Sequence, residues 1–181
     1  MLTRDTRGIA IGCLSGGEAK EEYCKVVAAC TELLPEHTPR YVMGVGFPDD
    51  LVVSVALGAE MSDYVWPTRT ARFGNAAAAM GTLNLRQQIF AEDFRPVEEG
   101  CQCVCCRPVE KGGLGITRAF IYHTAVKKTA GAHLLGIHNV FFLLDLMRQA
   151  REAILTDEYP AFYPQSFVCL FGSIRSFTVT V

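Results

Sequence analysis

The sequence predicts an α/β fold built around a parallel sheet, and two features of its first third carry that prediction. Short apolar runs suited to buried strands alternate with stretches of helical spacing, and glycine or proline stands at the changeovers. The expected strands are residues 7–12, 40–46 and 61–66, and the expected helices are residues 19–34 and 48–60. Strand, helix and strand in this succession are typical of βαβ units, whose strands pair in parallel.

Each expected element has a local reason. The first two strands, "RGIAIG" and "RYVMGVG", each end in glycine, and Pro67 stops the third. The helix at 19–34 repeats apolar residues at a spacing that places them on one face. The helix at 48–60 has Pro48 near its start and Gly58 near its end. Three strands do not close a parallel barrel.

The composition of the sequence changes after Trp66. A loop rich in small and basic residues is expected at 67–81, and a polar connector follows it. Glycines in "RPVEKGGLGITRAF" indicate an exposed loop at 107–120. Residues 131–157 carry the strongest helical pattern in the chain.

Composition limits the classes of function. The chain has 181 residues, 50% apolar and 20% charged, which suits one ordinary domain with a core. A net charge of −2 excludes a molecule that binds nucleic acid through its overall charge, so RNA binding would need a local basic patch. No run of apolar residues reaches the length of a membrane span, and the first residues do not resemble a secretory signal. We therefore expect a reducing compartment, where thiols stay free or bind metal.

Half of the eight cysteines lie within "CQCVCC", residues 101–106. Cys101, Cys103 and Cys106 form a C-x-C-x-x-C pattern that can present three sulfurs to one zinc ion, and His138 on the long helix is the candidate fourth ligand. Alternatives stay open at this point. They are Cys105 in place of Cys106, His123 or His133 as weaker histidine ligands, a packed core role for His138, and a reduced thiol cluster without metal.

Asp63 is the second candidate, because it lies in a short apolar strand where an unpaired carboxylate is costly to bury. Acids at the ends of parallel strands in α/β barrels are often catalytic. The alternative is a structural role, as a helix cap or in an ion pair with Arg69 or Arg72.

Three weaker signals concern binding. The glycine-rich turns "LSGGE" (14–18) and "MGVG" (43–46) allow a ligand to approach the backbone closely. Arg69 and Arg72 are candidate phosphate contacts, although such arginines are usually part of a solvated loop. A basic stretch is expected around the cysteines, against Glu110, from Arg107, Lys111, Arg118, Lys127 and Lys128.

Five segments occur in the order seen in tRNA-guanine transglycosylases, namely "CLSGGE", "RYVMGVG", "DLVVSVALGAEMSDYVWPTRTARFG", "CQCVCC" and "GIHN". From about Gly8 to about Phe167 the chain resembles this family, and within it the eukaryotic-type catalytic subunits of queuine tRNA-ribosyltransferase. The resemblance implies the C-terminal portion of a (β/α)8 barrel with an inserted zinc-binding subdomain. On that basis residues 1–95 are barrel strands and helices, 96–160 the zinc-binding subdomain with the long helix, and 161–181 an atypical tail of unknown role.

The resemblance also implies an activity and its residues. The family exchanges guanine at the wobble position of tRNAs with GUN anticodons for queuine, through a covalent intermediate between an aspartate and the ribose. Asp63 matches that aspartate, and Arg69 and Arg72 match positions that face the anticodon loop. Cys101, Cys103, Cys106 and His138 match the ligands of Zn2+. The base pocket is matched by Leu14, Ser15, Gly16, Gly17 and Met43.

Departures from the family pattern shape the remaining expectations. The match begins near the sixth barrel strand, Cys13 stands where glycine is usual, and "EKGGLGIT" resembles an insertion. The chain is therefore expected to be a truncated form with little activity alone. We also expect a heterodimer with a related non-catalytic subunit, no membrane span, and a location in the cytoplasm or at the outer mitochondrial surface. The alternative function is a non-catalytic zinc- and RNA-binding or dimerisation module beside a full-length partner.

Overall fold

The computed structural model describes residues 6–14, 16–125 and 129–162, and these form two compact units that meet in the sequence between Val65 and Trp66. The predicted domain boundary at residue 95 and the predicted tail at 161–181 stay predictions.

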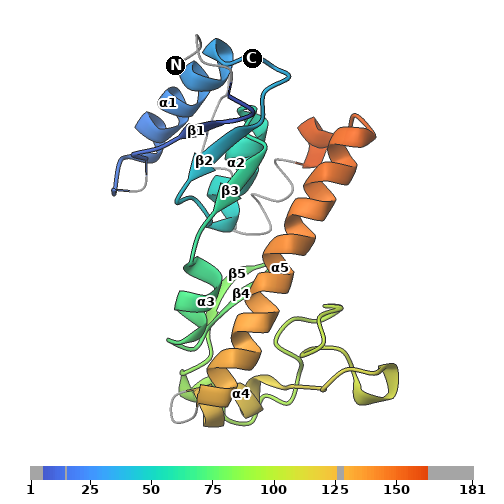
Figure 1. The fold of residues 1–181 in the computed structure, drawn as a ribbon. Coiled ribbons are helices and arrows are strands. Elements are labelled where there is room, and N and C mark those ends of the chain that lie inside the picture. The colour runs from blue at the N-terminus through green and yellow to red at the C-terminus, as the bar shows by residue number, and fades with distance from the viewer. Residues whose placement is uncertain (1–5, 15, 126–128, 163–181) are drawn as a thin grey trace. The chain divides into compact units, whose positions relative to one another are not determined.

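The N-terminal unit is a parallel α/β layer, as predicted (Figure 1). Its elements in chain order are β1 (Ile9–Ile11), α1 (Lys20–Leu33), β2 (Arg40–Met43), α2 (Pro48–Ala56) and β3 (Met61–Asp63). The sheet order is β1-β2-β3, with Ile9 opposite Arg40 and Met43 opposite Asp63. The mixed α/β character of the fold is thereby confirmed.

The register of this sheet decides which side chains meet. Tyr41 lies opposite Met61, and Met43 lies opposite Asp63. Because side chains alternate along a strand, Tyr41, Met43 and Asp63 share one face of the sheet. Beneath the layer, Val27 of α1 and Val42 of β2 are fully buried and form the centre of the core of this unit.

The C-terminal unit is mainly helical, with one antiparallel hairpin. Its elements are α3 (Trp66–Ala71), β4 (Asn75–Ala78), β5 (Gly81–Asn84), the 3-10 turns η1 (Gln88–Phe90) and η2 (Val109–Lys111), α4 (Arg118–Ala125) and α5 (Thr129–Leu155). The long helix predicted at 131–157 is confirmed. In Figure 1, α5 runs beside α3 and the hairpin, and it packs on both.

The predicted loop at 67–81 is wrong, because this segment contains most of α3, all of β4 and the start of β5. Pro67 looked like a stop signal, yet it occupies the first turn of α3, where a missing N–H removes no helical hydrogen bond. The run of alanines hid β4, because Ala76, Ala77 and Ala78 are all buried and show no alternation. The exposed loop predicted at 107–120 is also only partly right, since it contains η2 and the start of α4.

Among the described residues, α5 is long and apolar enough to cross a membrane by length and composition alone. The centre of the helix carries His138 and Asn139, both fully buried and both hydrogen-bonded to β4. A buried polar pair with partners in a neighbouring strand is typical of the core helix of a globular unit.

Candidate metal centre and strand-end carboxylate

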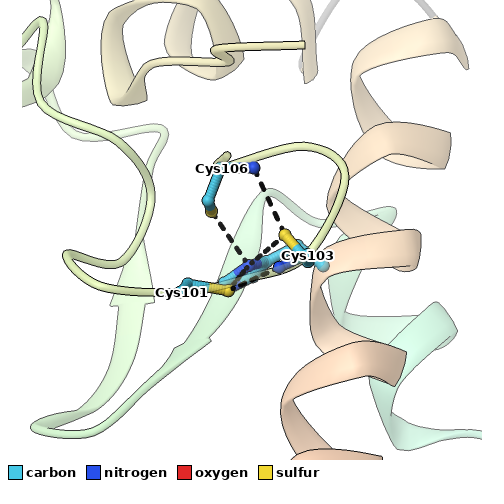
Figure 2. Close-up of side chains that lie close together, drawn as sticks. Cys101, Cys103 and Cys106 are labelled. Atoms are coloured by element: carbon cyan, nitrogen blue, oxygen red, sulfur yellow. Dashed lines mark hydrogen bonds between the residues drawn. The ribbon is translucent and has the colours of Figure 1, made fainter. Parts of the chain in front are cut away.

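Three cysteine sulfurs and one histidine nitrogen converge on a single point in the C-terminal unit. The sulfurs of Cys101, Cys103 and Cys106 lie 3.8, 3.5 and 3.3 Å from Nδ1 of His138. All four ligand atoms lie within 4.8 Å of one another, and only Cys101 is partly exposed. Figure 2 shows the three cysteines around this point. The four residues chosen from the sequence are therefore brought together.

The distances fit a tetrahedral ion. With metal–sulfur and metal–nitrogen bonds of the lengths that zinc makes, a regular tetrahedron separates the nitrogen from each sulfur by about 3.6 Å. The three measured separations bracket that value. Three soft sulfurs and one imidazole nitrogen form a closed donor set of the kind found in structural metal sites. The residues present therefore fit a metal ion.

The cysteine loop is shaped to present its sulfurs inward. The backbone N–H of Cys103 donates to the sulfur of Cys101, and the N–H of Cys106 donates to the sulfur of Cys103. Such bonds stabilise sulfurs that carry negative charge. A turn in which Arg107 N–H donates to the Cys103 carbonyl holds the third cysteine in place.

The imidazole ring of His138 is oriented by a hydrogen bond from the nitrogen that faces away from the sulfurs. Its Nε2 lies 2.8 Å from the carbonyl oxygen of Ala77 in β4, so Nε2 carries the proton and Nδ1 faces the sulfurs. A backbone carbonyl in this position fixes the ring tautomer of a metal-binding histidine. The helix therefore presents a prepared ligand.

The thiols and the imidazole of the cluster shift one another's pKa in opposite directions. Hydrogen bonds from Cys101 and its neighbours hold the pKa of the Cys103 thiol far below its usual range, while Cys101 and Cys103 raise the pKa of the Cys106 thiol. Burial disfavours a charged imidazole, but the bonds to Cys101 and Cys103 outweigh it and raise the pKa of His138 to about 10. Metal binding displaces such protons, so the affinity of this site for a metal ion should fall at low pH.

The alternative ligands are arranged differently. The sulfur of Cys105 points to the carbonyl oxygen of Leu134 at 3.2 Å, and the bond to Cys103, followed by burial, raises the pKa of its thiol. His123 lies 3.2 Å from the carbonyl of Ala91, and His133 is exposed on α5. Of these residues, none belongs to the metal-binding group found among the described residues.

A flap formed by residues 108–116 covers the cysteine loop. The N–H groups of Leu114, Gly115 and Ile116 donate to the carbonyls of Val104, Arg107 and Cys105, at 2.8, 3.0 and 2.7 Å. Gly113 is required by the close approach, because a Cβ there would lie 1.9 Å from the Arg107 carbonyl oxygen. Cys103, Cys105 and Cys106 are at most 5% exposed and belong to the core of this unit.

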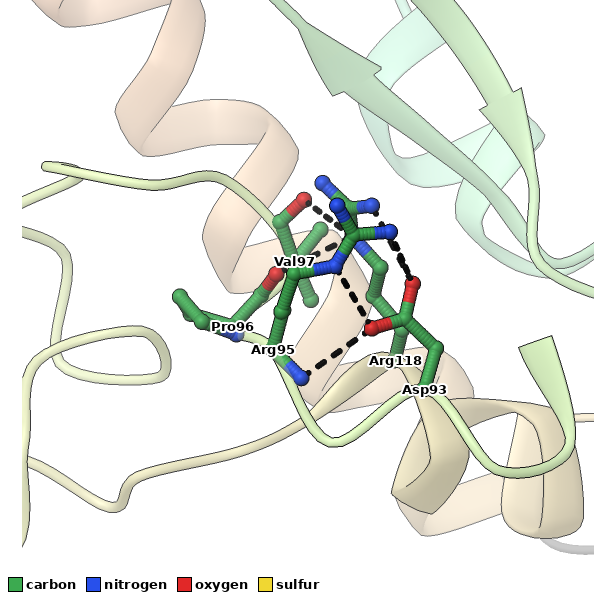
Figure 3. A network of polar contacts seen from close by, with 5 residues as sticks. All are labelled: Asp93, Arg95, Pro96, Val97 and Arg118. Atoms are coloured by element: carbon green, nitrogen blue, oxygen red, sulfur yellow. Dashed lines mark hydrogen bonds and ion pairs between the residues drawn. The ribbon is translucent and has the colours of Figure 1, made fainter.

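An acidic residue anchors the segment that leads into the cysteine loop (Figure 3). Asp93 pairs with Arg95 at 2.7 Å and with Arg118 of α4 at 3.3 Å, and these guanidinium groups, Arg95 first, hold the pKa of its carboxyl well below its usual range. Arg118 also donates to the carbonyls of Pro96 and Val97. The predicted basic stretch is therefore wrong in part, because Arg118 is half-buried in this network instead of facing a ligand. Lys127 and Lys128 lie outside the described residues.

In the N-terminal unit, Asp63 closes β3 and is exposed. Its Oδ1 accepts hydrogen bonds from the Tyr41 hydroxyl and from the backbone N–H of Gly44, the latter at 3.1 Å. These two donors, Tyr41 first, hold the pKa of the Asp63 carboxyl below its ordinary value. Tyr41 was not among the residues chosen from the sequence, and only the strand register places it beside Asp63.

A Tyr41→Phe variant should raise the pKa of Asp63 toward the ordinary carboxyl value near 4. In the wild type the pKa of Asp63 is lower in the folded chain than in the unfolded chain. The two bonds therefore stabilise the folded chain at a pH above the unfolded-state pKa, and this stabilisation is lost as the pH falls through the folded-state pKa. Carboxyl carbon NMR titration measures the change. Tyr23→Phe is the control, because the Tyr23 hydroxyl bonds to Ser54. An unchanged pKa of Asp63 in Tyr41→Phe would contradict this account.

Two of the five residues predicted for a base pocket, Leu14 and Gly17, line one cavity, and a third, Met43, lies opposite Asp63 in the sheet. A cavity of about 240 Å³ is lined by Leu14, Gly17 and Gly44, with Phe47 and Tyr64 among its other walls. Gly16 and Met43 are exposed, and Ser15 lies outside the described residues. Cys13 has a φ of 63°, a region that favours glycine. The base-pocket assignment itself stays a prediction.

Arg69 lies on α3 and Arg72 directly follows it, and both are exposed. The opposite side of α3 is buried through Trp66, Pro67 and Ala71. Both arginines therefore lie at the surface of the C-terminal unit, and their predicted role in RNA binding stays a prediction.

Comparison with known proteins identifies the family. A family model described as "Queuine tRNA-ribosyltransferase" matches residues 1–168. The queuine tRNA-ribosyltransferase catalytic subunit of Schizosaccharomyces pombe is 54% identical over 167 residues, which are 92% of this chain and 41% of that protein. That of Caenorhabditis elegans is 48% identical over 97% of this chain and 42% of its own length, and the queuine tRNA-ribosyltransferase of Thermus thermophilus is 44% identical over 87% and 40%. This chain thus spans about two fifths of the length of these relatives. It belongs to the queuine tRNA-ribosyltransferase family.

Proposed function

We propose that this chain carries the nucleophile and the zinc centre of a tRNA base-exchange enzyme, which replaces guanine at the wobble position of GUN-anticodon tRNAs with queuine. The observation that carries the proposal is the coexistence of two sites in one family member. One is an ionised carboxylate at the end of a parallel strand, and the other is a closed cluster of three cysteines and one histidine. The match to the relatives supports the substrate class.

The geometry around Asp63 suits nucleophilic attack. Both described hydrogen bonds to its carboxylate end on Oδ1, so Oδ2 is the atom left to react. In the proposed step Oδ2 attacks C1′ of the ribose, the bond from C1′ to guanine breaks, and guanine leaves with the electron pair and takes up a proton. The incoming base then attacks C1′, releases the carboxylate and gives up its proton. Two displacements retain the configuration at C1′.

We assign zinc to the metal cluster because its donor set is typical of structural zinc sites. When bound, the ion supplies cross-linking instead of chemistry at the base, since all four of its positions are filled by the protein. Cys101, Cys103 and Cys106 hold it to the cysteine loop, and His138 holds it to α5. The ion would thereby fix the cysteine loop to the helix that packs on α3, which carries Arg69.

A chimera tests the proposed activity. Residues 8–168 of this chain should replace the matching segment of the Schizosaccharomyces pombe relative, and exchange of labelled guanine into a GUN tRNA should be measured. Exchange within about tenfold of the parent protein is expected. The isolated 181-residue chain should show little exchange, because its sheet has only three strands among the described residues. A folded, zinc-loaded chimera without exchange would support the alternative, a non-catalytic zinc- and RNA-binding or dimerisation module.

The heterodimer with a related non-catalytic subunit and the location in the cytoplasm or at the outer mitochondrial surface stay predictions. Co-purification of a second subunit with the tagged chain from its source cells would test the first.

A further inference from the structure

Asn139 is a buried polar residue that neither the metal cluster nor the proposed chemistry uses. It is fully buried at the centre of α5, directly after the metal-binding His138. The described hydrogen bonds of its side chain all go to residues outside its own helix. The amide oxygen accepts from the Ala77 N–H at 2.8 Å, and the amide nitrogen donates to the carbonyls of Pro67 and Asn75, each at 3.0 Å.

These three bonds join three elements at one point. Pro67 is in the first turn of α3, whereas Asn75 and Ala77 belong to β4, and Asn139 lies in α5. A single side chain thus ties the start of α3 to the hairpin and to the helix that holds the metal ligand. The bonds to Ala77 and Pro67 are buried and the bond to Asn75 is partly buried. Loss of the amide would remove the described partner of the Ala77 N–H and of the Asn75 carbonyl, and leave the Pro67 carbonyl with the long bond from the Thr70 hydroxyl.

The surroundings make an amide the suitable group for this position. One neighbour is a donor and two are acceptors, and asparagine offers one acceptor oxygen and a nitrogen with two hydrogens. A leucine of similar size would satisfy none of them. The arrangement therefore specifies one orientation of α3 relative to α5.

We propose that Asn139 is a positioning residue for RNA binding, which holds α3 so that Arg69 and Arg72 face the anticodon loop. This inference rests on the proposed function, because the two arginines are proposed RNA contacts. It goes beyond that function because it links the two arginines to the metal centre. His138 and Asn139 are neighbours in the sequence, and both form hydrogen bonds to the backbone of Ala77 in β4.

The test compares two variants of the full 181-residue chain. Asn139→Leu removes the three bonds, and Leu135→Ala is the matched control, because Leu135 is buried in the same core on the same helix and its side chain cannot form hydrogen bonds. The first readout is amide hydrogen exchange in peptides covering residues 66–78, relative to peptides from α4. The second is the visible absorption of cobalt(II) added to the metal-free protein, which reports the cysteine–metal geometry. The third is the affinity for a GUN anticodon stem-loop and its dependence on salt.

Asn139→Leu should speed exchange in residues 66–78 at least about tenfold relative to α4, while the cobalt spectrum stays unchanged. It should weaken RNA binding about tenfold and flatten the salt dependence, as is also expected for Arg69→Ala and Arg72→Ala. Leu135→Ala should lower stability but leave the salt dependence unchanged. Unchanged exchange in residues 66–78, or loosened exchange with unchanged RNA affinity, would overturn the proposal.

Failure of the proposed function has a different signature. If Arg69→Ala and Arg72→Ala leave RNA affinity unchanged, the RNA surface is wrong, and the hydrogen-exchange comparison alone decides whether Asn139 holds α3.

Discussion

A Cys103→Ser variant is expected to bind no zinc and to lose the native fold of the C-terminal unit. Structural zinc sites contribute about 10–16 kcal/mol in isolated zinc-finger peptides, which matches or exceeds the whole stability of an ordinary domain. Cys103 lies at the centre of the cluster and is part of the core of this unit. Loss of the ion therefore removes a cross-link between the cysteine loop and α5. It also leaves buried thiols and an imidazole that compete for protons.

Two measurements check this expectation. Metal analysis should fall from one zinc per chain to nearly none, and the emission of Trp66, the single tryptophan, should shift toward that of exposed indole. Trp66 is buried at the start of α3, so it reports the fold of the C-terminal unit. Cys105→Ser is the control, because Cys105 is equally buried but points to Leu134. Equal metal loss in both variants would contradict the assignment of these ligands, and an unchanged Trp66 emission in Cys103→Ser would show that the ion is not needed for the fold of the C-terminal unit.

Asp63→Asn in the chimera is expected to abolish the covalent RNA adduct and to lower guanine exchange by at least about 10⁴-fold. An amide keeps the shape and can still accept hydrogen bonds from Tyr41 and Gly44, but it is not a nucleophile toward C1′. The loss should therefore fall on the chemical step and spare RNA binding.

A denaturing gel of the chimera with a labelled anticodon stem-loop detects the adduct, and a binding assay on the same RNA separates chemistry from affinity. Glu60→Gln is the control, since this acid precedes β3 and pairs with Arg40. An adduct that persists in Asp63→Asn would transfer the nucleophile role to another residue. Loss of RNA affinity in that variant would instead indicate a binding role.

The N-terminal unit was predictable because its local signals agree with one another. Apolar runs, helical spacing and the placement of Pro48 all indicate the same succession of elements, and that succession implies parallel pairing. The partner of Asp63 was not predictable, because a tyrosine in a strand is ordinary. Its role follows only from the register that sets Tyr41 opposite Met61.

In the C-terminal unit, ligand spacing was informative and backbone signals were misleading. The C-x-C-x-x-C pattern identifies three ligands by itself, and the structure brings His138 to them across a long stretch of chain. In the same unit, α3 was missed because Pro67 looked like the end of an element, and β4 was missed because its alanines show no alternation. Asn139 could not be singled out, since its partners come from two segments that the sequence presented as a loop.

The flap over the cysteine loop has a consequence for how metal enters and leaves. Cys103 and Cys106 are at most 5% exposed, and residues 114–116 of the flap donate hydrogen bonds to the carbonyls of Val104, Arg107 and Cys105. We expect the ion to leave when residues 108–116 detach, because buried ligands are reached by local opening of the structure. The rate at which a strong chelator strips the purified protein should then be independent of chelator concentration, because it measures the opening of this segment.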